Sequence, residues 1–86
     1  MIVTKQTVAE RIAAHLQHRV TLPQLVVWAE NAMMDGEFDE KDAATISAVV
    51  ARLGVADVRA FGLTWTDCEE LLAKLGFSAR VEIIAA

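Results

Sequence analysis

Cysteine is nearly absent from this chain of 86 residues, in which Cys68 stands alone. A single cysteine cannot form a disulfide within the chain. Long apolar runs are absent too, because the longest, Leu25 to Ala29, is far shorter than the ~20 residues that a membrane-spanning helix needs. Met1 to Arg11 also lacks the apolar stretch and the cleavage site of a signal peptide. We therefore expect a protein of the cytoplasm that has no membrane partner.

Basic residues are scarce and scattered: eight Lys and Arg stand against twelve Asp and Glu, which gives a net charge of −4. Nucleic-acid-binding domains usually present a basic face. A helix-turn-helix could be drawn over residues 55–76, but its second helix would offer Asp67, Glu69 and Glu70 to the bases. The composition therefore argues against a nucleic-acid partner and favours a basic protein partner.

Acidic residues gather in one short stretch, in which Lys41 is the only basic residue. The stretch begins like a calcium-binding loop, but the places of the turn glycine and the final glutamate of an EF-hand hold Glu40 and Ile46. It is then either an interhelical loop whose acids stabilise the next helix N-terminus, or a docking patch for a basic protein. Its acidic members are Asp35, Glu37, Asp39, Glu40 and Asp42.

Residues that could carry chemistry do not form a pattern. The four glycines stand singly where helices are expected to end, so no glycine-rich phosphate loop is present. His15 and His18 could face one metal ion, but two ligands do not make a zinc site. Cys68 shares a helical face with three leucines, which is typical of a buried thiol that acts as a small hydrophobe. We expect no enzyme activity, no cofactor and no metal.

Capping signals and apolar spacing predict four or five short helices. Thr7 with Glu10, and Thr21 with Gln24, have the spacing of capping boxes, and Pro23 suits a first helical turn. Asp39 is the predicted cap of the third helix, and Gly36 is expected in the left-handed conformation after the second. The expected helices run over Thr7–His18, Leu22–Asp35, from Asp39 to Gly54, over Ala56–Phe61, and from Thr64 or Thr66 to Gly76.

The last segment changes from helical to strand periodicity. Phe77, Ala79, Val81 and Ile83 alternate with mainly polar residues. We expect a short C-terminal strand that pairs with Met1 to Val3, or one in which Arg80 to Ile84 pairs with a second copy or another protein. The predicted fold is a single domain over residues 1–86, mainly α with short terminal strands, and α+β is the alternative.

The second predicted helix carries more apolar residues than one buried stripe needs. Val27 and Met34 lie outside the main stripe, and Trp28 flanks it. Either this helix is buried on nearly all sides, or it presents a second apolar strip to a partner. Trp65, after its Thr64 cap, is either a core residue or an exposed interface anchor. The predicted partner-binding residues are Val27, Trp28, Met34, Asp35, Glu37, Asp39, Glu40, Asp42 and Trp65.

The Trp28-Ala29-Glu30 helix and the segment from Gly54 to Trp65 give the chain a general likeness to small bacterial proteins. In size and charge it resembles acidic helical immunity proteins and antitoxins. The resemblance implies an inhibitor-like module that binds a basic or apolar protein, and it assigns no functional residue. Self-association is a second kind of partner that the sequence allows. The alternative function is a regulatory domain that binds a small molecule between Trp28, Met33, Met34 and Trp65.

Overall fold

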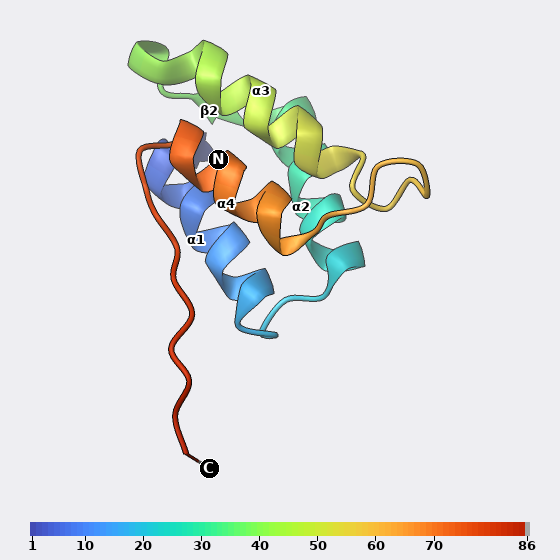
Figure 1. Cartoon of the computed structure of the whole chain (residues 1–86). Coiled ribbons are helices and arrows are strands. Elements are labelled where there is room, and N and C mark those ends of the chain that lie inside the picture. The colour runs from blue at the N-terminus through green and yellow to red at the C-terminus, as the bar shows by residue number, and fades with distance from the viewer. Residues whose placement is uncertain (86) are drawn as a thin grey trace.

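The computed structural model describes residues 1–85, which form a bundle of helices with one very small sheet (Figure 1). The mainly α prediction is therefore confirmed. The elements in chain order are β1 (Ile2–Val3), α1 (Lys5–Leu16), α2 (Leu22–Asp35), β2 (Glu37–Phe38), the short 3-10 helix η1 (Glu40–Asp42), α3 (Ala43–Gly54) and α4 (Trp65–Lys74).

Three of the helix starts are fixed by threonine caps. The side chain of Thr21 accepts from the backbone N–H of Gln24, and the Gln24 side chain returns a bond to Thr21, so the second predicted helix is confirmed with its bounds. Thr64 caps α4 in the same way. The first helix begins earlier than predicted, because Thr4 and not Thr7 is its cap. The hydroxyl of Thr4 accepts from the backbone N–H of Thr7 at 3.1 Å.

The N-terminal strand pairs with the linker between α2 and α3, not with the C-terminus. β1 and β2 run parallel, with Ile2 opposite Glu37 and Val3 opposite Phe38. The backbone N–H of Glu37 donates to the Met1 carbonyl at 2.7 Å, which locks this short ladder. The expected C-terminal strand is wrong for the isolated chain, because residues 77–85 make no ladder with any described residue.

Gly36 joins α2 to β2 in an extended conformation, with φ −79° and ψ 147°, so the predicted left-handed cap is wrong. A glycine is needed there for space. A Cβ atom at this position would lie 2.5 Å from the Ala32 carbonyl oxygen and 3.0 Å from Cγ2 of Val3. The close approach lets β1 lie directly over the end of α2.

The segment between α3 and α4 does not form the helix predicted over Ala56–Phe61. Isolated turns occupy it, and Gly62 closes the last of them with φ +60°. Arg52 holds this loop from α3, because its guanidinium donates to the Gly62 carbonyl at 3.0 Å and lies 3.4 Å from the Asp67 carboxylate. These bonds stabilise a chain path that turns back toward Arg52. A continuous helix over Ala56–Phe61 would not follow that path.

The core lies where the inner faces of all four helices meet. Buried side chains from every helix contribute to it, among them Ile12, Leu25, Ile46, Leu53 and Leu72. α2 and α3 pack against each other most extensively, and α4 lies beside α1 (Figure 1). Within residues 1–85 no helix is both long and apolar enough to cross a membrane.

Candidate protein-binding surface

Helix α2 buries one face and exposes two apolar side chains on another. Leu25, Ala29 and Ala32 are fully buried against the core, whereas Val27 is 55% exposed and Met34 73% exposed. Residues seven apart lie on the same side of a helix, two turns from each other. Helix α2 is therefore not buried on nearly all sides, and Val27 and Met34 face solvent with the exposed polar residues Glu30 and Asn31 between them.

Trp28 does not belong with these two exposed residues. It is half-buried and packs against the core, and the Arg11 guanidinium of α1 lies 5.4 Å from the centre of its ring. A guanidinium at this distance is attracted by the electron-rich face of an indole. Trp28 is thus engaged within the chain and joins α2 to α1.

The acidic cluster divides into residues with structural partners and residues that face solvent alone. Asp39 caps η1 by accepting from the Lys41 backbone N–H at 3.2 Å. Asp42 is partly buried and forms an ion pair of 3.6 Å with Lys5. The other three are exposed, and no ion pair or side-chain hydrogen bond joins them to another described residue. They are Asp35, Glu37 and Glu40.

Met1 and Ile2, which the sequence predicted to pair with the C-terminus, lie beside the acidic residue Glu37 of β2 instead. The β1–β2 pairing sets Ile2 opposite Glu37, and both Met1 and Ile2 are exposed. Their short apolar run was visible in the sequence, but it predicted a partner strand for the C-terminus. The α2–β2 surface is defined here as the exposed side chains of Met1, Ile2, Val27, Met34, Asp35, Glu37 and Glu40.

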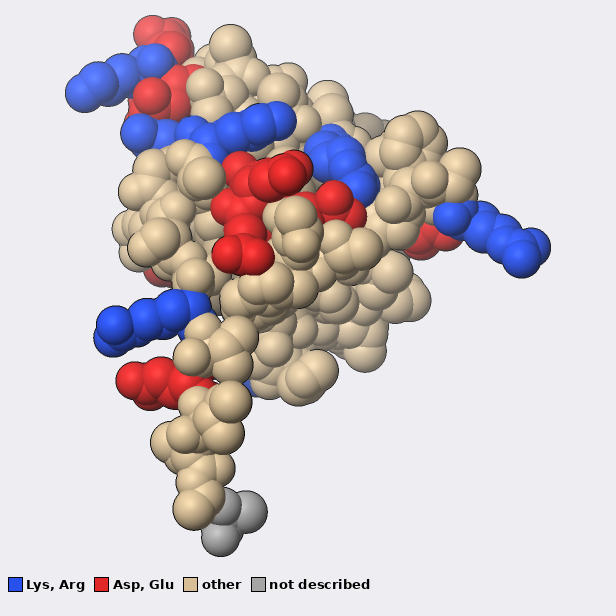
Figure 2. Space-filling view, in the orientation of Figure 1, with Lys and Arg blue, Asp and Glu red and all other residues tan. Residues whose placement is uncertain are grey.

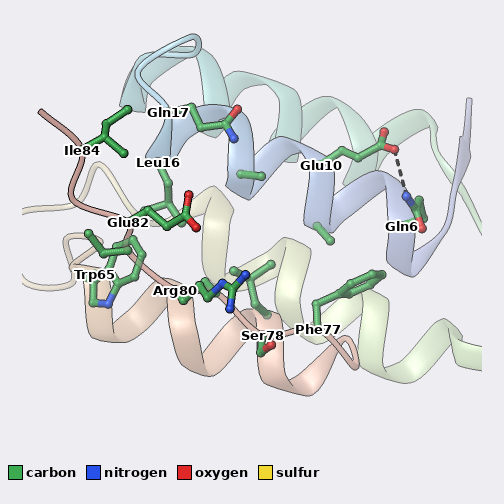
Figure 3. A pocket seen from close by; sticks show the side chains of 15 residues that line it. Gln6, Glu10, Leu16, Gln17, Trp65, Phe77, Ser78, Arg80, Glu82 and Ile84 are labelled. Carbon is green, nitrogen blue, oxygen red and sulfur yellow. Dashed lines mark hydrogen bonds between the residues drawn. The ribbon is translucent and has the colours of Figure 1, made fainter. Parts of the chain in front are cut away.

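Trp65 lies apart from the α2–β2 surface, so the structure does not bring all the predicted binding residues together. It begins α4, is 39% exposed, and borders a groove of about 850 Å³ between α1, α4 and the C-terminal segment (Figure 3). Ala9, Ala13 and Leu16 of α1 line one wall, and Leu72 of α4 lines the other. The pocket expected to join Trp65 with Trp28, Met33 and Met34 is not formed, because these three residues are on α2 and do not line the groove.

Cys68 and His15, which could have carried chemistry, have structural roles. Cys68 is buried, and desolvation, with a smaller contribution from the charge of Asp67, raises the pKa of its thiol. Nδ1 of His15 lies 3.1 Å from the Val20 carbonyl oxygen, so this imidazole ties the end of α1 to the next turn. Among the residues that the structure describes, no group of three or more His, Cys, Asp or Glu side chains could hold a metal ion.

On the face seen in Figure 2, acidic side chains also gather over α4, which carries Asp67, Glu69 and Glu70. Acidity is therefore not confined to the α2–β2 surface. The α2–β2 surface combines exposed carboxylates with exposed apolar side chains.

Comparisons with protein-family models, with curated proteins and with solved structures give no significant match to this chain.

Proposed function

We propose that this protein is a cytoplasmic protein-interaction module that binds a basic, amphipathic segment of another protein at the α2–β2 surface. The observation that supports it is the exposure of Val27 and Met34 beside carboxylates that have no cationic partner within residues 1–85. Exposed apolar side chains bordered by charged ones are typical of protein interfaces.

The two kinds of side chain have different tasks in this proposal. Burial of Val27, Met34 and Ile2 under a partner supplies most of the affinity, because each removes a large apolar area from water. Methionine adapts its shape to a partner easily. The carboxylates of Asp35, Glu37 and Glu40 attract a basic segment and repel acidic ones, so they set selectivity and association rate.

An inhibitor-like role agrees with this chemistry, because an inhibitor needs a binding face and no catalytic group. A basic segment of a target protein would lie along α2 with its apolar residues on Val27 and Met34. Its Lys or Arg residues would then meet the carboxylates near β2. Binding of this kind weakens as salt rises, since the charges on the rim are exposed to solvent.

A pull-down from native cytosol tests the proposal. Tagged wild-type protein is compared with a Glu37→Lys/Glu40→Lys variant and with a matched Glu69→Lys/Glu70→Lys variant, which changes the net charge by the same amount on α4. We expect wild type and the α4 variant to retain the same basic protein and the α2–β2 variant to lose it. With the purified partner, the α2–β2 variant should bind at least about tenfold more weakly.

The apolar half of the surface is tested separately with Met34→Ser, which leaves all charges in place. It should weaken binding of the purified partner with little change in its salt dependence. Equal binding by wild type, Met34→Ser and both charge variants would refute the assignment of the α2–β2 surface, and so would a retained protein that is acidic.

A second candidate function, small-molecule binding, is supported by the groove beside Trp65. Its volume of about 850 Å³ is within the range of ligand sites, and a half-exposed indole suits a flat apolar ligand. A panel of metabolites should then raise the melting temperature, and Trp65→Ala should abolish the shift. A flat panel would count against this candidate and leave the α2–β2 proposal untouched.

A further inference from the structure

The chain that follows α4 continues as an extended segment whose end projects beyond the bundle (Figure 1). Within residues 1–85 its last backbone hydrogen bond runs from the Phe77 N–H to the Leu72 carbonyl at 2.9 Å. From residue 78 to residue 85 no backbone group bonds to another described residue. Val81 is 67% exposed, Ile83 95% and Ile84 82%. The segment over residues 77–85, called the tail from here on, thus combines free strand edges with exposed aliphatic side chains.

Extended geometry divides the tail side chains into two rows. Side chains two apart in an extended chain lie on the same side. Phe77, Ala79, Val81 and Ile83 form the apolar row, and Ala79 packs against the core, so this row begins on the body of the protein. The other row carries the only two charges of the tail, Arg80 and Glu82. Figure 2 shows a basic and an acidic side chain that project from the tail to the same side.

We propose that the tails of two copies of this protein pair as an antiparallel β-ribbon centred on Val81. In this register Arg80 of each copy lies opposite Glu82 of the other copy, so two opposite-charge pairs form at once. Val81 lies opposite Val81, and Ile83 of one copy lies beside Ala79 of the other. The exposed Ile83 of each copy therefore lies next to the point where Ala79 of the other copy packs on its own core.

The charge pattern selects this register over its neighbours. Centring the ribbon on residue 80 or 82 would set Arg80 opposite Arg80 or Glu82 opposite Glu82. A parallel in-register ribbon would oppose both like pairs. Like charges directly opposite each other destabilise a sheet, and opposite charges stabilise it. A register slip of one residue would also break up the apolar row. Val81 is therefore the centre about which this tail complements itself.

A two-stranded ribbon alone is marginal in water, so the groove bordered by the tail has a part in the pairing. The tail runs along the trough between α1 and α4, past Trp65 and Leu16 (Figure 3). A second strand placed beside it adds apolar contacts at that trough. The paired area is smaller than a standard interface, so we expect a weak dimer with a dissociation constant on the order of micromolar or above.

Charge exchange within the full chain tests the pairing. Sedimentation equilibrium at micromolar concentrations and above should show a monomer–dimer equilibrium for wild type. In Arg80→Glu both pairs become Glu opposite Glu, and in Glu82→Arg both become Arg opposite Arg. Each should raise the dissociation constant about tenfold. A mixture of these two variants should restore the dimer as a heterodimer, and the double exchange Arg80→Glu/Glu82→Arg should restore it as a homodimer.

Cysteine cross-linking tests the register and the antiparallel direction. Under mild oxidation Val81→Cys should form a disulfide-linked dimer, because opposed Cα atoms in an antiparallel pair are about 4.5–5.5 Å apart. Ile83→Cys should not link to itself, since its own counterpart lies about 13 Å along the ribbon. A mixture of Ala79→Cys and Ile83→Cys should link. Wild type, whose buried Cys68 is the only thiol, is the control.

The outcomes separate this proposal from its competitors. Self-linking by both Val81→Cys and Ile83→Cys would show a parallel ribbon and overturn the register. A monomer at every concentration, with no cross-link, would overturn self-pairing. Because the α2–β2 surface and the tail are different parts of the molecule, none of these results depends on whether a basic partner binds at α2.

Discussion

Replacement of Gly36 by alanine sets two effects of opposite sign against each other. Alanine restricts the unfolded chain, which stabilises a protein by about 0.4–1 kcal/mol where the native backbone accepts it. The backbone at Gly36 does accept it, because φ is −79°. The space around Gly36 does not hold the added methyl group, because the new Cβ would stand 2.5 Å from the Ala32 carbonyl oxygen. That oxygen is part of the helix backbone and cannot move without disturbing the end of α2.

The steric effect should therefore win. Overpacking that forces backbone shifts typically costs about 1–3 kcal/mol, so Gly36→Ala should lower the free energy of unfolding by about 1–2 kcal/mol. For a chain of this size that corresponds to a melting temperature lower by roughly 4–16 °C. The Cβ would also press on Val3, 3.0 Å away, so the β1–β2 pairing beside the α2–β2 surface should loosen as well.

Gly54 provides the matched control. It ends α3, has no positive φ, and a Cβ there would meet no atom within 4 Å. Gly54→Ala should consequently stabilise the protein by about 0.4–1 kcal/mol. Chemical denaturation followed by helical circular dichroism measures both variants. If Gly36→Ala proved as stable as Gly54→Ala, the close approach of Gly36 to Ala32 would be refuted.

Three further predictions concern α4. Thr64→Ala removes the cap and should cost about 1 kcal/mol of stability in the same denaturation assay, whereas Thr66→Ala should change it by less than about 0.5 kcal/mol. Hydrogen bonds from Thr64 lower the pKa of Asp67 from its ordinary value of 3.8, so its stabilising effect is present above pH 3.8 and is lost as pH falls through the lowered pKa; Asp67→Asn should show a flatter stability profile in denaturation curves taken above and below that pH. The buried Cys68 thiol, with its raised pKa, should react with a thiol reagent at neutral pH only slowly, and much faster once denaturant unfolds the chain; equal rates would contradict its burial.

Local signals predicted those parts of the fold that local interactions decide. The bounds of α2 followed from the Thr21–Gln24 capping box and from the position of Gly36, although Gly36 is extended and not left-handed, because such signals act over a few positions. The burial of Cys68 followed from its helical spacing with leucines. The sequence favours Thr7 as a cap because Glu10 stands at its third following position, whereas in the structure Thr4 directly follows β1 and caps α1.

Long-range interactions decided what the sequence could not predict. A two-residue strand such as Glu37–Phe38 has no periodicity to recognise, so the partner of β1 was invisible. Likewise Arg52 reaches Gly62 and Asp67 across the loop, and no local sequence pattern predicts those bonds. For the proposed binding surface, the sequence identified Val27 and Met34 as surplus to one stripe, but their exposure depends on which helices cover α2.

The two proposed surfaces have a joint consequence because they are separate. A dimer held by its tails would carry two α2–β2 surfaces, and a partner with two basic segments could occupy both. The second contact would then be intramolecular, and apparent affinity would rise well above that of one site if the geometry lets both engage. Residue 80 lies outside the α2–β2 surface. Arg80→Glu should therefore lower the affinity for a bivalent partner and leave the affinity for a single basic peptide unchanged. Loss of affinity for the single peptide as well would show that the tail belongs to the binding surface itself.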